Sequence, residues 1–135
     1  MLNIKLGKAQ YSVYFGYEAT VRSGIIKKLV GATRDTEDQY ENIDKMMNLL
    51  PEMLLVGLQK FHAKEYGYNL KTEEGKDEAL SKVFSLLDEY FETEDADFEN
   101  LLTSLQTELM ENGFLAKMFK KEVEKAENQE KEEKK

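Results

Sequence analysis

The chain contains no cysteine, and this absence removes several kinds of chemistry at once. Disulfide bonds, thiolate metal sites and cysteine nucleophiles are all excluded. Histidine is nearly absent as well, since His62 is the only one. A catalytic triad needs a nucleophile beside an imidazole base, and a di-iron helical bundle needs two Glu-x-x-His motifs. No serine has a recognisable activating context, so we interpret His62 as a structural or surface residue and expect no enzyme activity, no cofactor and no metal.

Sequence motifs that bind phosphate or calcium are also missing. Neither G-x-x-x-x-G-K-[ST] nor G-x-G-x-x-G occurs. No register of the acidic residues 88–97 places a glycine where an EF-hand loop requires one. We interpret the acidic segment 92–97 as a solvated loop that supplies helix caps.

Long apolar runs are lacking too. No segment reaches the roughly 18–20 apolar residues of a membrane span, and the first residues lack the apolar core of a signal peptide. The formal charge of −8 over 135 residues disfavours nucleic acid and anionic membranes by repulsion. We therefore expect a cytosolic protein of one domain, with no nucleic acid and no membrane among its partners.

Alternating apolar residues at the start of the chain predict a β-hairpin over about residues 2–15. Its strands cover residues 2–6 and 10–15, and Gly7-Lys8 suits the tight turn between them. A two-stranded hairpin is marginal in water by itself, so it must pack on the helices or pair with another chain. Since an edge strand seeks a partner, the hairpin is the expected contact between copies.

The most apolar stretch of the chain, residues 49–67, is predicted to be a central buried helix. Its apolar stripe supplies three predicted core residues: Leu54, Leu58 and Phe61. A helix over residues 37–49 precedes it, and Pro51 is expected to break or sharply kink the chain between the two. Four apolar residues along and directly after that preceding helix are expected to face the core: Tyr40, Ile43, Met47 and Leu50.

Helical periodicity also covers residues 17–30, 76–91 and 96–112. These helices add three predicted core residues: Phe84, Leu87 and Leu105. The last sixteen residues, 120–135, are Lys/Glu-rich and cannot bury a core, so they form a frayed helix or a disordered tail. The predicted fold is mainly α: a small helical bundle of four to five helices over residues 1–119, with an N-terminal β-hairpin and a charged C-terminal tail.

Aromatic residues gather near the two ends of this predicted domain. Five of them are candidates for protein interaction: Tyr11, Tyr14, Phe15, Phe114 and Phe119. Tyrosine and phenylalanine, with methionine nearby, are typical of surfaces that recognise other proteins. The alternative is that most of these side chains belong to the core. Because no catalytic set is present, binding to other proteins is the default function.

Several stretches carry a family resemblance: YFGYEATVRSGI, LLPEMLLVGLQKFHAKEYGYN, GKDEALSKVFSLLDEYF and LLTSLQTELMENGFL, followed by the Lys/Glu-rich tail. In this order, over residues 1 to about 119, the chain resembles the tail assembly chaperones of long-tailed phages and prophages of Gram-positive bacteria. These are small, acidic, mainly helical proteins. The resemblance rests on the overall pattern and on short stretches of similar sequence, since none of these stretches is a catalytic motif.

The resemblance implies a role in tail assembly inside the bacterial host. Such chaperones coat the tape measure protein, deliver tail tube subunits, form homo-oligomeric rings or spirals, and are absent from the mature virion. A longer product arises in that family by ribosomal frameshifting near the end of the reading frame. The Lys134-Lys135 pair can be encoded by a run of A nucleotides, which is the kind of slippery sequence that a frameshift needs.

A second hypothesis follows from the negative charge alone. An acidic phage protein can inhibit a host nucleic-acid enzyme by mimicking DNA. Such a mimic needs two spaced acidic rows on one face, whereas acid in this chain is interspersed with lysine and concentrates only at residues 92–97. Salt-sensitive capture of a host nuclease or polymerase is the observation that distinguishes this hypothesis from a tail assembly role.

Overall fold

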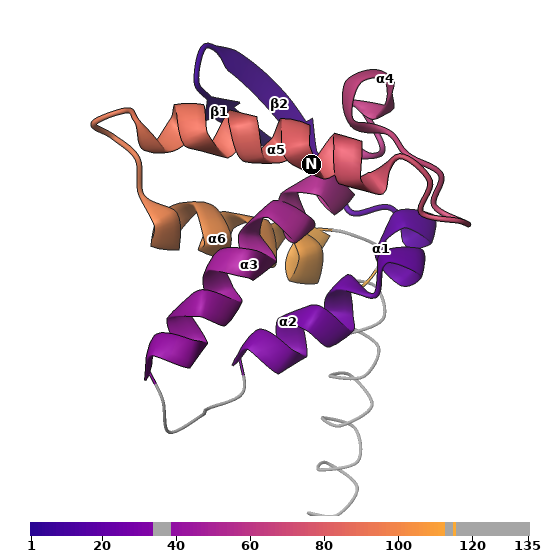
Figure 1. The fold of residues 1–135 in the computed structure, drawn as a ribbon, viewed down its shortest axis with the longest axis horizontal. Helices are drawn as coiled ribbons and strands as arrows, with labels where there is room; N and C mark the ends of the chain where they lie inside the picture. Colours follow the sequence, from indigo (N-terminus) through magenta and orange to yellow (C-terminus); the bar gives the residue numbers. More distant parts are fainter. Residues whose placement is uncertain (34–38, 113–114, 116–135) are drawn as a thin grey trace, which may run out of the picture.

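A computed structural model describes residues 1–33, 39–112 and 115 (Figure 1). It confirms the predicted class, a mainly helical bundle with an N-terminal antiparallel hairpin. The charged tail lies outside the described residues. In chain order the elements are β1 (Leu2–Leu6), β2 (Ala9–Val13), α1 (Tyr17–Ser23), α2 (Ile25–Thr33), α3 (Gln39–Leu58), α4 (Ala63–Tyr66), α5 (Lys76–Phe91), α6 (Phe98–Thr107) and the π-helical turn η1 (Glu108–Asn112).

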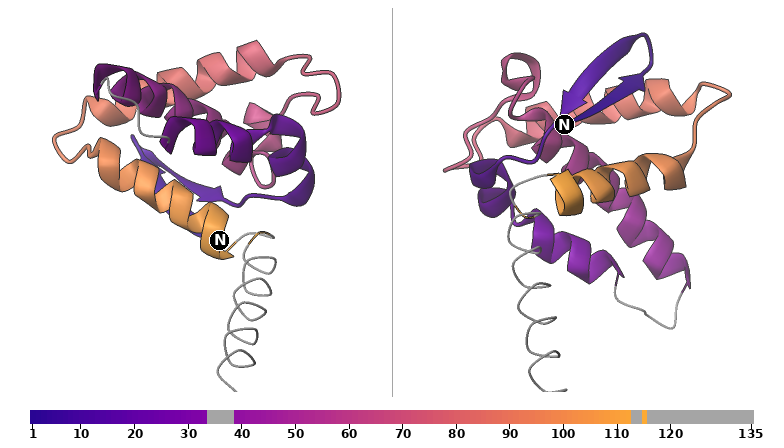
Figure 2. Two further views of the ribbon diagram at one scale, coloured as in Figure 1. Left: turned by 90° about the horizontal axis from the view of Figure 1, so that it is seen from below. Right: turned by 180° about the vertical axis from the view of Figure 1, so that it is seen from behind.

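The hairpin forms where alternation predicts it. Leu6 pairs with Ala9 across the Gly7-Lys8 turn, and Gly7 has φ +65°, a value that glycine adopts without a steric penalty. β1 lies along α5 and β2 along α3 (Figure 2), so one face of the hairpin is turned toward the helices. Leu6 and Val13 are at most 1% exposed, which shows that the hairpin belongs to the core rather than standing free.

The centre of the core is the second half of α3. Met53, Leu54, Leu55, Val56 and Leu58 are each at most 1% exposed, so this part of the helix is covered on every side. A helix apolar around its whole circumference is expected to be buried in this way.

The helix limits differ from the sequence-based expectation at Gly24, at Pro51 and at Leu58, where α3 ends although the predicted central helix runs to residue 67. The predicted helix over residues 17–30 is wrong, because Gly24 at φ +67° ends α1 and the chain restarts as α2. Of the predicted break or sharp kink at Pro51, the break is wrong, because α3 continues through this residue. An interior proline costs a helix about 3 kcal/mol. Burial of Leu50 and Leu54 on either side of it offsets that cost.

Four of the six predicted core residues are buried, and two are not. The buried four are Leu54, Leu58, Leu87 and Leu105. Phe61 is 52% exposed because α3 ends at Leu58, which takes Phe61 off the helical stripe and into the turn before α4. Phe84 is 48% exposed because α5 buries a neighbouring stripe through Val83 and Leu87. The prediction that Phe61 and Phe84 belong to the core is therefore wrong.

The first half of α3 also departs from expectation. Tyr40, Ile43 and Met47 were expected to face the core but are 84%, 55% and 57% exposed. This part of α3 extends with α2 away from the hairpin and α5, as Figure 1 shows. The bundle therefore covers only one side of it, and the apolar stripe remains at the surface.

Candidate functional site

The aromatic residues predicted to bind other proteins mostly hold the hairpin in place. The ring centre of Tyr11 lies 5.2 Å from that of His62 and 6.0 Å from that of Tyr66, and both contacts are edge-on. Tyr14 meets Phe61 in the same manner at 6.4 Å. Phe15 is fully buried, so the prediction that it forms a binding surface is wrong. An alternating strand pattern places it, like Val13, on the inward face.

Phe114 and Phe119, the other two interaction candidates, lie outside the described residues. Tyr11 and Tyr14 are partly buried, and their visible contacts are with the chain itself. The phenol of Tyr66 donates to that of Tyr11 at 3.5 Å. Burial and this contact together raise the pKa of Tyr66 well above its usual range. The Tyr66 phenol is therefore neutral at ordinary pH.

His62 anchors the outer edge of β2. The Ser12 backbone N–H donates to His62 Nε2 at 3.0 Å, so Nε2 acts as the acceptor of this bond. The Tyr14 N–H donates to the Gly57 carbonyl at 3.0 Å. Together these bonds satisfy backbone groups that an edge strand otherwise leaves open.

Replacing His62 with alanine is expected to lower the free energy of unfolding by about 1–2 kcal/mol, because the part-buried Ser12 N–H loses its acceptor. Urea denaturation measures the loss, and amide hydrogen exchange should show faster exchange at Ser12. Lys64→Ala, at an exposed position on α4, is the control and should change stability by less than about 0.5 kcal/mol. Equal stability of the two variants would contradict the anchoring role.

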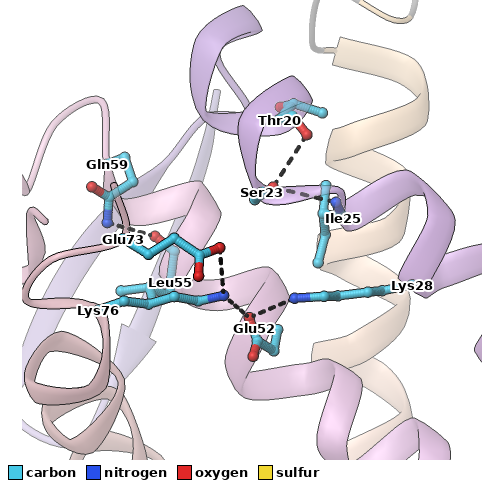
Figure 3. A network of polar contacts seen from close by, with 9 residues as sticks. All are labelled: Thr20, Ser23, Ile25, Lys28, Glu52, Leu55, Gln59, Glu73 and Lys76. Atoms are coloured by element: carbon cyan, nitrogen blue, oxygen red, sulfur yellow. Dashed lines mark hydrogen bonds and ion pairs between the residues drawn. The ribbon is translucent and has the colours of Figure 1, made fainter. Parts of the chain in front are cut away.

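Ion pairs join α2, α3 and the start of α5. Glu52 Oε2 lies 3.3 Å from Lys28 Nζ and 3.6 Å from Lys76 Nζ (Figure 3). Lys76 Nζ also lies 3.9 Å from Glu73 Oε1. Burial acts to lower the pKa of Lys76, but the carboxylates of Glu52 and Glu73 outweigh it and hold that pKa above its usual value. Lys76 is thus charged, and the ion pairs link α2, α3 and α5.

A groove of about 520 Å³ lies beside this network, and we name it the charged groove. Its lining residues are Lys28, Gly31, Ala32, Asp44, Lys45, Asn48, Leu49, Pro51, Glu52, Leu80 and Phe84. The charges at one end already pair with each other across it, as Glu52 does with Lys28. We therefore interpret the charged groove as part of the packing between α2, α3 and α5.

A second groove, of about 690 Å³, lies on another side of α3 and is formed with α6; we name it the apolar groove. Its lining residues are Asn42, Ile43, Met46, Phe98, Glu99, Leu102, Thr103 and Gln106. Leu102 is buried, Met46 and Phe98 are partly covered, and Ile43 is 55% exposed. Met47, one turn beyond Ile43, extends the exposed apolar surface.

The sequence contains the signal for this exposed surface, but its apolar residues on α3 were predicted to face the core. Tyr40, Ile43 and Met47 follow the 3–4 residue spacing of an amphipathic helix. That spacing identifies an apolar stripe but does not say whether the stripe faces the protein's own core or a partner. The structure makes the distinction through exposure, and Ile43 becomes the central candidate for partner contact.

Over the described ranges, no group of three or more His, Cys, Asp or Glu side chains is placed to hold a metal ion. In the same part of the chain, no helix combines the length and the apolar character needed to cross a membrane. Comparison of the chain with protein-family models, with curated proteins and with solved structures found no match.

Proposed function

We propose that this chain is a tail assembly chaperone of a long-tailed phage or prophage, which binds the tape measure protein, keeps it soluble and helps to recruit tail tube subunits. The observation that carries the proposal is the exposed apolar stripe of α3, at Ile43 and Met47, on an otherwise acidic helical protein. A surface of this kind supports protein binding. The family resemblance of the sequence supplies the identity of the partners.

The physical mechanism is coverage of apolar surface. A tape measure protein is long and largely helical, and its exposed apolar assembly faces aggregate when they are not covered. Copies of a small acidic helical protein cover such faces, and many weak contacts in a row give avidity. The net charge of −8 keeps the covered complex in solution by mutual repulsion.

The proposed role is non-catalytic and belongs to the cytoplasm of the bacterial host, before the virion is complete. His62, the single imidazole, is engaged by the Ser12 amide and serves the fold. In the longer frameshifted product, the charged segment 120–135 acts as a linker to a second domain that recruits tube subunits. A ring or spiral of copies along the tape measure protein is the proposed form of the complex.

Co-expression with the tape measure protein encoded beside this chain tests the proposal. The soluble yield of the tape measure protein should rise several-fold, and the two proteins should co-purify. An unrelated acidic helical protein of similar size is the control, since it supplies charge without the α3 stripe. Equal soluble yield with the chain and with the control protein would overturn the proposal.

A further inference from the structure

The α6 wall of the apolar groove belongs to a segment of the chain that contains no basic residue. Residues 83–116 contain nine acidic residues and neither lysine nor arginine. The nine are Asp88, Glu89, Glu92, Glu94, Asp95, Asp97, Glu99, Glu108 and Glu111. This segment includes most of α5, all of α6 and the connection between them. Glu99 is the charged residue among those that line the groove. Glu108 is buried and paired with the N-terminal amino group, so the negative charge near the groove comes from Glu99 and the exposed carboxylates before the start of α6.

Several of these carboxylates are exposed in the connection before α6 and in its first turn, where Phe98 and Glu99 line the groove. Glu92, Glu94, Asp95 and Glu99 are exposed, and within the described ranges none of the four is in an ion pair. Asp97 is different, because its carboxylate accepts the Asn100 N–H at 3.0 Å and caps α6. A cluster of exposed carboxylates without cationic partners attracts a basic ligand.

The floor of the groove is apolar and extends toward these carboxylates. Phe98 stacks on Phe91 with 6.2 Å between ring centres, and Phe91 is 41% exposed. The lining residues of α6 run from Phe98 to Gln106, which corresponds to about 12 Å at the helical rise of 1.5 Å per residue. This length matches the span of apolar anchors at i, i+3 or i+4, and i+7 on a docked helix.

We propose that the apolar groove binds an amphipathic α-helix whose apolar stripe is flanked by lysine or arginine residues. The apolar side chains of that helix contact Ile43, Met46 and Leu102, and its basic residues face the exposed carboxylates around Glu99. A second copy of this chain is a poor occupant of this groove, because its net charge of −8 opposes the exposed carboxylates around Glu99; a ring or spiral of copies would form through other surfaces. The inference rests on the proposed function only for naming the tape measure protein as the source of the helix.

A fluorescein-labelled helical peptide of leucine and lysine tests the groove directly by fluorescence anisotropy. Ile43→Lys should weaken its binding at least about tenfold, because the change removes an apolar anchor and adds like charge. Val21→Lys is the matched control: Val21 is 56% exposed on α1, away from the groove, and the change in net charge is the same. The control should alter affinity less than about twofold.

Two comparisons of the peptide itself check the chemistry. A leucine and glutamate peptide with the same spacing should bind at least about tenfold more weakly than the leucine and lysine peptide. A scrambled leucine and lysine peptide should also bind more weakly, because its apolar residues no longer share one face. Equal affinity of Ile43→Lys and Val21→Lys for the basic peptide would overturn the inference. So would a wild-type dimer that Ile43→Lys converts to a monomer, because a second copy then fills the groove.

The outcome separates this inference from the proposed function. If the wild-type chain binds the basic peptide through Ile43 but leaves the tape measure protein insoluble, the proposed function fails and the groove assignment stands. If the tape measure protein co-purifies equally well with wild type and with Ile43→Lys, while peptide binding is also unchanged, the groove assignment fails and the proposed function stands.

Discussion

Replacing Leu58 with alanine is expected to lower the free energy of unfolding by about 2–5 kcal/mol. Leu58 is fully buried at the end of α3, where the helix is surrounded by the hairpin and the other helices. Removing its side chain takes away apolar contact and leaves a cavity that a close-packed interior fills only in part. Urea denaturation followed by circular dichroism measures the loss.

Phe61→Ala is the informative comparison for Leu58→Ala. The two residues lie three positions apart and both were predicted to be in the core, yet Phe61 is 52% exposed in the turn after α3. Its loss removes an edge-on contact with Tyr14 and should cost less than about 1 kcal/mol. If Phe61→Ala lowered the free energy of unfolding more than Leu58→Ala, the end of α3 at Leu58 would be contradicted.

Replacing Gly57 with alanine is expected to destabilise the protein by about 2 kcal/mol, although alanine is the better helix former. A Cβ atom at position 57 would lie 2.5 Å from Val13 Cγ1 and 3.4 Å from Phe15 Cζ. Val13 is β-branched and fully buried, so it has little freedom to move aside. The added methyl group therefore pushes the hairpin away from α3, and denaturation with urea measures the cost.

Two further variants test the cause. Gly31→Ala in α2 is the matched control, because a Cβ atom there meets nothing within 4 Å; it should raise stability by up to about 1 kcal/mol. Val13→Ala alone should cost about 2 kcal/mol. In the Gly57→Ala background it should cost less than about 1 kcal/mol, because the new methyl group then fills the space. Additive losses would contradict the contact between Val13 and position 57.

Local patterns predicted those elements whose limits are set by nearby residues. Alternation and the Gly7-Lys8 turn located the hairpin, and the apolar stripe of residues 76–91 gave α5 its observed bounds. Pro51 was misinterpreted because the burial that keeps α3 continuous comes from residues distant in sequence. The periodicity of residues 17–30 did not predict the end of α1, because the left-handed conformation of Gly24 depends on how α1 and α2 pack.

The candidate site was harder to predict than the fold. Aromatic residues near the N-terminus suggested a binding surface, but Phe15 is buried and Tyr11 packs on Tyr66 and His62. The apolar groove depends on α6 covering one side of α3 and leaving Ile43 exposed. Helical periodicity identifies an apolar stripe, but it does not show whether a neighbouring helix covers that stripe. The exposure of the side chains in the structure shows it.

The mass of the complex formed with the tape measure protein tests the central claim most directly. Light scattering on the co-purified, size-separated material measures that mass. A chaperone that covers a long helical partner should give a complex containing several copies of this 15.7 kDa chain per tape measure protein. Elution of the two proteins at their separate masses, with no shared peak, would contradict the account.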